Sequence, residues 1–386
     1  MHAFSLAALV ATATLALACG SSDDPNTSGG TGGSTTGSGA GGAGTGVGGA
    51  GGTSTGAGGT GGGGAAAPAS GTYTAIGVGN WGLRGITTDA SAWTICQNPS
   101  TGNDHSPDLL RNVAYGDGVF VAVGGDANSM VMRSLDGMHW EEDLHPTTAC
   151  AGEPYPPSCT NWMGGVAYGD GTWLAGGGNG ALMRSTDAGL TWTGIHPADG
   201  PNAVRSIAHG AGLFVAGSDG GVVSVSADDG GSWTNHDLWN HAMTIAFGDG
   251  TFIAKGRSWN GSGFDYGCYV STDQAVTWNP CAPELLDAGP PVHSDGQWVT
   301  STDGGYLAST DGVSWTMHPA TDFPTELLFT GELWLGLRNG DAYTSTNLAD
   351  WQPAATNVPG FRAWTGGHVL DDNLPVEGIA ACQDNG

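Results

Sequence analysis

The chain has 386 residues, 71 of them glycine, and its 36 Asp and Glu against nine Lys and Arg give a formal net charge of −27. This charge disfavours nucleic-acid binding, because non-specific affinity for phosphates needs Lys and Arg that release counterions, and the nine basic residues form no run. An acidic surface of this kind mainly favours solubility.

The N-terminal segment is apolar and ends directly before Cys19. It is too short for a spanning helix, which needs about 20 apolar residues, so a cleaved signal peptide is predicted. The small residue before Cys19, with Leu17 and Leu15 upstream, resembles a bacterial lipoprotein signal. The resemblance implies a lipid on Cys19 and, because Gly20 rather than Asp follows, a lipoprotein of the outer membrane or cell surface of a Gram-negative bacterium. The alternative is an ordinary secretory signal with an unrelated cysteine.

A linker rich in Gly, Ser and Thr follows the cysteine. Between residues 29 and 64 nearly every residue is Gly, Ser, Thr or Ala, a composition that cannot bury enough surface to offset its ordering entropy. A chain of this kind would reach roughly 40 Å. The predicted organisation is a signal peptide at 1–18, the lipidated cysteine and a disordered linker at 19–70, and one folded domain at 71–386.

A sevenfold repeat organises the predicted domain. Each copy is a Ser-x-Asp or related turn that closes on a tryptophan, and the copies lie at residues 87–93, 134–140, 185–192, 226–233, 271–278, 309–315 and 345–351. The last copy has Asn347 in place of the aspartate. A period of about 40 to 45 residues is typical of propeller blades.

The residues before each turn predict strands. Two apolar runs are joined by a Gly-rich turn, as in 113–124 and 245–254, and Asp-Gly between such runs indicates a hairpin. A third strand enters the turn and a fourth leaves it, which predicts an all-β, seven-bladed propeller of four-stranded antiparallel blades. Blade one starts at its second strand, 73–79, and we expect 360–367 to supply the missing innermost strand.

The repeated Ser-x-Asp-x-Gly-x-x-Trp string resembles the Asp-box, or BNR, repeats of several propeller families: sialidases, sortilin-type receptors, xyloglucan hydrolases and the photosystem II assembly factor. The resemblance supports the fold and implies little about function. In such a turn Ser and Asp bond backbone amides, and Gly takes a positive φ. The aspartates predicted to be structural are Asp136, Asp187, Asp228, Asp273 and Asp311.

Six cysteines remain besides Cys19, an even number that predicts three disulfides in an exported protein. The predicted pairs are Cys268–Cys281 across the fifth hairpin, Cys150–Cys159 around a Pro-rich loop, and Cys96–Cys382 as a clasp across the ring closure. No CxxC or HxxxH spacing occurs, so neither a metal site nor a cofactor is predicted.

Three long insertions, at 94–110, 141–162 and 255–267, are predicted on the face shared by the second-to-third-strand loops and the blade-to-blade loops. Long loops on a rigid scaffold often carry function. Their aromatic residues could stack on sugar rings or contact a protein, or could pack their own loops: Trp162, Trp259, Tyr155, Phe264 and Tyr266. The arginines near the inner strands could form a small anion site, or could pair with Asp: Arg111, Arg205 and Arg362.

The sequence gives no support for sialidase activity. The Arg-Ile-Pro string of sialidases is missing, and Arg84 is the only arginine of blade one. We expect an exported, lipid-anchored, non-catalytic binding or scaffold module for a protein or glycan, which touches the membrane only through its lipid. The alternative is a glycan-active hydrolase or lyase that uses carboxylates of the loop face, and fold alone does not separate the two.

Overall fold

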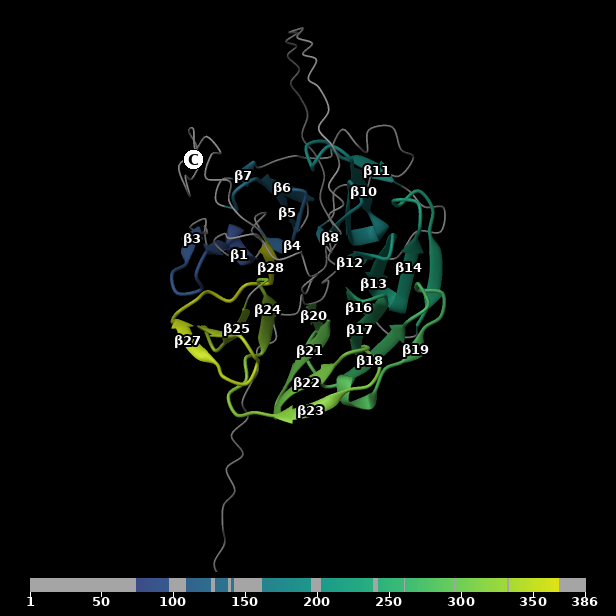
Figure 1. Cartoon of the computed structure of the whole chain (residues 1–386). Helices are drawn as coiled ribbons and strands as arrows, with labels where there is room; N and C mark the ends of the chain where they lie inside the picture. Colours follow the sequence, from purple (N-terminus) through teal and green to yellow (C-terminus); the bar gives the residue numbers. More distant parts are fainter. Residues whose placement is uncertain are drawn as a thin grey trace, which may run out of the picture. The chain divides into compact units, whose positions relative to one another are not determined.

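The computed structural model describes residues 74–96, 109–125, 129–137, 140–141, 162–195, 203–238, 242–259, 261–294, 296–331 and 333–367. These residues form seven four-stranded antiparallel sheets, and the fold is the seven-bladed β-propeller that the repeat predicts (Figure 1). The predicted signal peptide, Cys19 and the linker lie outside the described residues. Within the described ranges, no helix has the length and apolar character needed to cross a membrane.

Each blade has four strands, numbered here from the centre of the ring outward. The first strands are β28 (Ala363–Gly367), β4 (Leu110–Gly116), β8 (Met163–Gly169), β12 (Val204–Gly210), β16 (Ala242–Gly248), β20 (Val292–Ser294) and β24 (Glu326–Phe329). The second strands are β1 (Thr74–Val78), β5 (Val119–Gly124), β9 (Thr172–Gly177), β13 (Leu213–Ser218), β17 (Thr251–Trp259), β21 (Gln297–Thr302) and β25 (Trp334–Arg338).

The outer strands complete the blades. The third strands are β2 (Arg84–Thr87), β6 (Met130–Ser134), β10 (Leu182–Ser185), β14 (Val222–Ser226), β18 (Phe264–Ser271), β22 (Gly305–Ser309) and β26 (Asp341–Ser345). The fourth strands are β3 (Thr94–Cys96), β7 (Trp140–Glu141), β11 (Thr193–Ile195), β15 (Thr234–Asp237), β19 (Asn279–Pro280), β23 (Thr316–Pro319) and β27 (Gln352–Ala355). The described residues also include the short 3-10 turns η1 (Asn80–Gly82), η4 (Gly178–Gly180), η5 (Asp219–Gly221) and η6 (Pro283–Leu285).

The first strands meet around the centre of the ring. Each contacts the first strands of both neighbouring blades, in an unbroken cycle from β28 through β4, β8, β12, β16, β20 and β24 back to β28. The apolar cores lie between adjacent blades. Trp140, which closes the second repeat, packs with Ile76 and Ile86 of blade one, as expected for a large side chain that seals a blade interface.

The C-terminal strand closes the ring as predicted. β28 pairs with β1 from Thr74↔Gly367 to Val78↔Ala363. Just before β28, the ring of Phe361 lies against two backbones: a Cβ atom on Gly77 or Gly85 would come within 2.3 or 2.5 Å of it. Glycine is required at both positions because no other residue leaves room for this contact.

The repeat turns have the hydrogen bonds that their residue types favour. In blade four, Ser226 accepts from the Gly230 amide at 2.8 Å and donates to Asp228 at 2.9 Å. Asp228 in turn accepts from the Ser232 amide at 2.8 Å. The Asp-Gly connections between first and second strands also behave as predicted: Asp249 and Gly250 have φ of 45° and 81°, as a type I′ hairpin turn requires.

Candidate functional site

The structure corrects one of the three predicted insertions. Residues 255–267 were expected to be a loop, but β17 and β18 continue as a paired hairpin through Arg257↔Tyr266, Ser258↔Asp265 and Trp259↔Phe264. Aromatic residues are enriched in β-strands. The chain turns in the Gly-rich stretch between Trp259 and Phe264. We call residues 257–266 the hairpin extension.

The hairpin extension distinguishes blade five from the five blades whose connection between the second and third strands is fully described. In blades one, three and four the second and third strands are joined by the 3-10 turns η1, η4 and η5. In blades six and seven they are joined by two residues, such as Asn339 and Gly340 between β25 and β26. The first-to-second-strand ladder of blade five ends at Ala242↔Gly256, so the hairpin extension lies beyond its inner neighbour.

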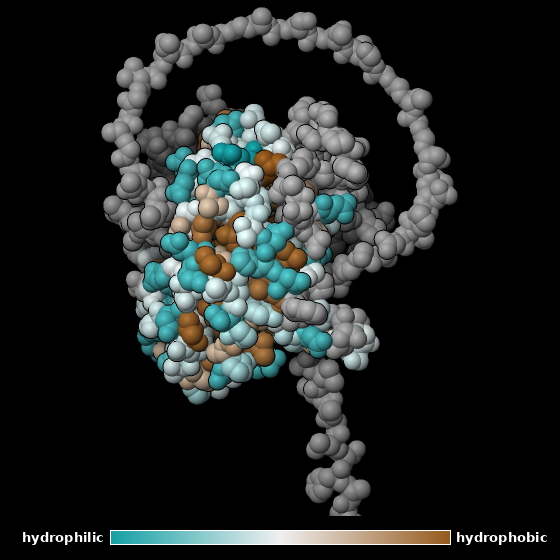
Figure 2. Space-filling model, turned by 90° about the vertical axis from the view of Figure 1, so that its right-hand side faces the viewer, coloured by the Kyte–Doolittle hydropathy of each residue, from teal (hydrophilic) through white to brown (hydrophobic). Residues whose placement is uncertain are grey.

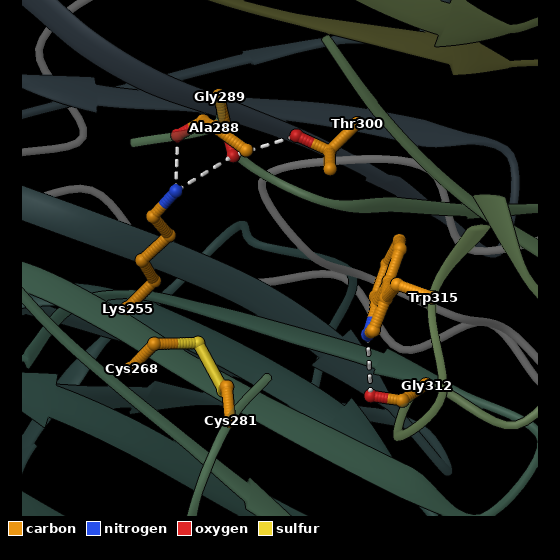
Figure 3. Close-up of a disulfide and its surroundings, with 8 residues drawn as sticks. All are labelled: Lys255, Cys268, Cys281, Ala288, Gly289, Thr300, Gly312 and Trp315. Atoms are coloured by element: carbon orange, nitrogen blue, oxygen red, sulfur yellow. Dashed lines mark hydrogen bonds between the residues drawn. A yellow bond between two sulfur atoms is a disulfide. The ribbon is translucent and has the colours of Figure 1, made fainter. Parts of the chain in front are cut away.

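One disulfide and the hydrogen bonds of one lysine stabilise the base of the hairpin extension (Figure 3). The predicted Cys268–Cys281 pair is a disulfide in the structure, and it ties β18 to the chain after β19. Lys255, the register partner of Cys268, donates hydrogen bonds to the backbone carbonyls of Ala288 and, at 3.2 Å, Gly289. Burial lowers the pKa of Lys255 to about 8. These contacts hold the strands in place where the hairpin extension joins the rest of blade five.

Aromatic side chains are exposed on the hairpin extension. Phe264 and Tyr266 keep 44% and 43% of their surface accessible, and their i, i+2 spacing places both on one side of β18. The guanidinium of Arg257 lies 4.1 Å from the centre of the Phe264 ring. On the side of the molecule shown in Figure 2, hydrophobic residues form small separate areas among polar ones. Sequence reasoning missed Arg257, although its alternation with Trp259 before a Gly-rich turn was the signal for a strand.

A second cluster lies where the first strands begin. Trp162 lies between two arginines, with ring-centre distances of 5.1 Å to Arg111 and 4.2 Å to Arg205. Arg111 and Arg205 occupy equivalent positions in β4 and β12, as predicted. The ring of Trp162 is fixed closely over Gly164, where an added Cβ would come within 2.7 Å of it. We call these three side chains the Arg-Trp-Arg stack.

The two arginines of the Arg-Trp-Arg stack already have hydrogen-bond acceptors within the protein, which makes an anion site there less favourable. Asp219 accepts two hydrogen bonds from Arg205, at 2.8 and 2.7 Å, which is the bidentate geometry that satisfies a guanidinium. Arg111 donates to the carbonyl of Gly125 at 3.2 Å. Arg362 has the matching position before β28, and its side chain donates to Asn80 in its own blade. The predicted alternative, pairing with Asp, applies to Arg205.

Among the described residues, one carboxyl group has a pKa well above its usual value. Glu326 begins the first strand of blade seven. Burial raises the pKa of its carboxyl to about 7, although the residue as a whole is exposed. A protonated carboxyl at neutral pH is the form that a general acid needs. Burial is the cause of this shift, and a glycosidase would need a second carboxylate beside this group. Within the described ranges, no three His, Cys, Asp or Glu residues gather as metal ligands.

The remaining predicted residues fall into two groups. The five repeat aspartates lie in the turns after the third strands and bond to the serine or threonine hydroxyls and amides of those turns, as for Asp273 with Thr277 at 2.6 and 2.9 Å. Tyr155, Cys150, Cys159 and Cys382 lie outside the described residues, as do the side chains of Cys96 and Trp259. The two disulfides other than Cys268–Cys281 stay predictions.

A groove that the sequence did not predict lies at the closure. It has a volume of about 490 Å³ between the outer strands β3 and β27, with apolar walls from Trp93, Ile95 and Val358. Trp93 also packs on Phe361, with ring centres 5.3 Å apart, so the groove belongs to the seam between the last and the first blade.

No family model matches the chain, and no curated protein matches it. Among solved structures, it is similar to YCF48 bound to a D1 peptide, with a TM-score of 0.47 and 17% identity over 70% of this chain and 92% of that chain. It is also similar to the computationally designed Ika8 protein, with a TM-score of 0.45 and 13% identity over 73% and 86% of the two chains. YCF48 from Cyanidioschyzon merolae gives a TM-score of 0.46 and 15% identity over 63% and 84%. At such identities the likeness concerns architecture alone.

Proposed function

We propose that this protein is a non-catalytic binding module that is held at the cell envelope by a lipid on Cys19 and captures a protein or glycan through its loop face. The observation that carries the proposal is the hairpin extension, which exposes Phe264 and Tyr266 above a braced base. Aromatic side chains and arginine are enriched where proteins bind partners. The linker after Cys19 would supply the distance between lipid and domain.

The site chemistry favours binding over catalysis. The carboxyl of Glu326 has the raised pKa of a potential acid, and it is the specific observation in favour of a glycan-active hydrolase or lyase. Both glycosidase mechanisms need a second carboxylate about 5 to 10 Å away, and burial accounts for the pKa of Glu326. The hairpin extension offers surface instead of an acid–base pair.

Retention and turnover can be measured in one experiment. The purified protein is incubated with envelope proteins and, separately, with envelope polysaccharides, and both retained material and released reducing ends are scored. We expect retention without release. Release that Glu326→Gln abolishes would replace the binding module with the hydrolase, and the absence of any retention would reject the binding function.

The anchor has its own test. Metabolic labelling with palmitate should label the protein in a Gram-negative host, and Cys19→Ser should abolish both the label and membrane fractionation. A labelled Cys19→Ser variant would contradict lipidation at this residue.

A further inference from the structure

Arg257 differs in its polar contacts from six other arginines of the chain. Four of the described arginines pair with a carboxylate: Arg133, Arg184, Arg205 and Arg338. Arg111 and Arg362 donate to a backbone carbonyl and to an asparagine side chain. Arg257 has no such acceptor among the described residues, and its contact is with an aromatic ring. The chain has a net charge of −27, yet no carboxylate among the described residues pairs with the Arg257 guanidinium.

The surroundings of Arg257 orient it for a ligand. Its guanidinium lies 4.1 Å from the Phe264 ring centre, and Tyr266 is its direct cross-strand partner. Stacking occupies a planar face of the guanidinium and leaves its N–H edges for acceptors. A carboxylate matches these edges with two parallel hydrogen bonds. The exposed rings of Phe264 and Tyr266 then provide an apolar area beside the bound carboxylate.

The backbone of the hairpin extension favours an extended ligand. The β16–β17 ladder ends at Gly256, while β17 continues to Trp259. Among the described residues no strand lies on the inner side of the last residues of β17, which therefore form a strand edge. An extended peptide can add to such an edge through its main chain while alternate side chains contact the sheet surface.

We propose that the hairpin extension binds an extended segment of a partner protein, with an Asp or Glu of that segment on Arg257 and a neighbouring apolar side chain on Phe264 and Tyr266. This inference rests on the proposed binding function and names its ligand chemistry. The acidic surface of the protein repels a carboxylate. An acidic side chain of the partner is therefore attracted only where a cation is not already neutralised, which makes the contact with Arg257 selective.

A displayed library of random 12-residue peptides provides the test. Selection on the wild-type protein should enrich peptides that carry Asp or Glu two residues from an apolar side chain. Arg257→Gln should remove the acidic preference and weaken a selected peptide by about tenfold or more, since a charge-assisted bidentate contact is lost. Arg257→Lys, which keeps the charge without the forked geometry, should restore part of the affinity.

Arg338→Gln is the matched control, because Arg338 ends β25 at the corresponding connection of blade seven and is already paired with Asp322. This variant should select the same peptides as the wild type. Equal acidic enrichment by Arg257→Gln, or no acidic enrichment at all, would overturn the proposal. Oligogalacturonate that binds through Arg257 while no peptide is selected would also overturn it in favour of an acidic glycan, and would leave the proposed binding function intact.

Discussion

Replacing Phe361 with alanine should weaken the closure of the ring. Phe361 is 4% exposed, its ring fills the space above Gly77 and Gly85, and it packs on Trp93. Small backbone shifts cannot fill this space, because two strands of blade one form its floor. The loss should therefore be that of a fully buried Phe→Ala change, about 3 to 5 kcal/mol.

The assay is thermal and urea unfolding, followed by tryptophan fluorescence and by circular dichroism. A loss of this size should lower the melting temperature by roughly 10 °C. Phe264→Ala is the matched control, since it deletes the same atoms from a side chain that is 44% exposed, and such surface changes are usually within about 0.5 kcal/mol. Equal losses in the two variants would refute the role of Phe361 at the closure.

Three further predictions concern stability and protonation. Replacing Cys268 and Cys281 with serine should cost about 3 kcal/mol, because their separation of 13 residues closes a loop of that size; unchanged urea unfolding would contradict this. The pKa of Asp273 is lowered to about 2, chiefly by the Thr277 hydroxyl, so its stabilisation is lost as pH falls from about 4 through 2, and Thr277→Val should raise the pKa in an NMR titration. Burial raises the pKa of Glu326 to about 7 from 4.5, so the wild type should lose stability relative to Glu326→Gln as pH rises between these values; a constant difference in melting temperature from pH 4 to 8 would show that this shift is absent.

The repeat allowed most of the fold to be predicted. The prediction rested on local signals. The Asp-Gly turn at Asp249 and Gly250 has positive φ at both residues, and each repeat turn is formed by hydrogen bonds between residues that lie within about five positions of each other. The closing strand was predictable because the residues after Phe361 repeat the start of a blade. Such features depend on neighbours in sequence, which a repeat displays several times.

The candidate site was less predictable. The stretch 255–267 contains glycines that suggested a loop, and only the ladder to Trp259↔Phe264 shows how far the strands continue. The partners of Arg205 and Arg257 depend on which side chains a blade brings together in space. Asp219 lies 14 residues from Arg205, and no spacing rule distinguishes it from the other acidic residues of this chain.

Shortening the hairpin extension tests the central claim most directly. Residues 257–266 are replaced by Asn-Gly, the two-residue connection that joins β25 to β26 as Asn339 and Gly340, which leaves Gly256 paired with Gly267. The measurement is the retention of envelope protein or glycan by this variant, compared with the wild type at matched folded fractions. We predict that retention is lost while the melting temperature changes little. Full retention by the shortened protein would contradict the assignment of ligand binding to the hairpin extension.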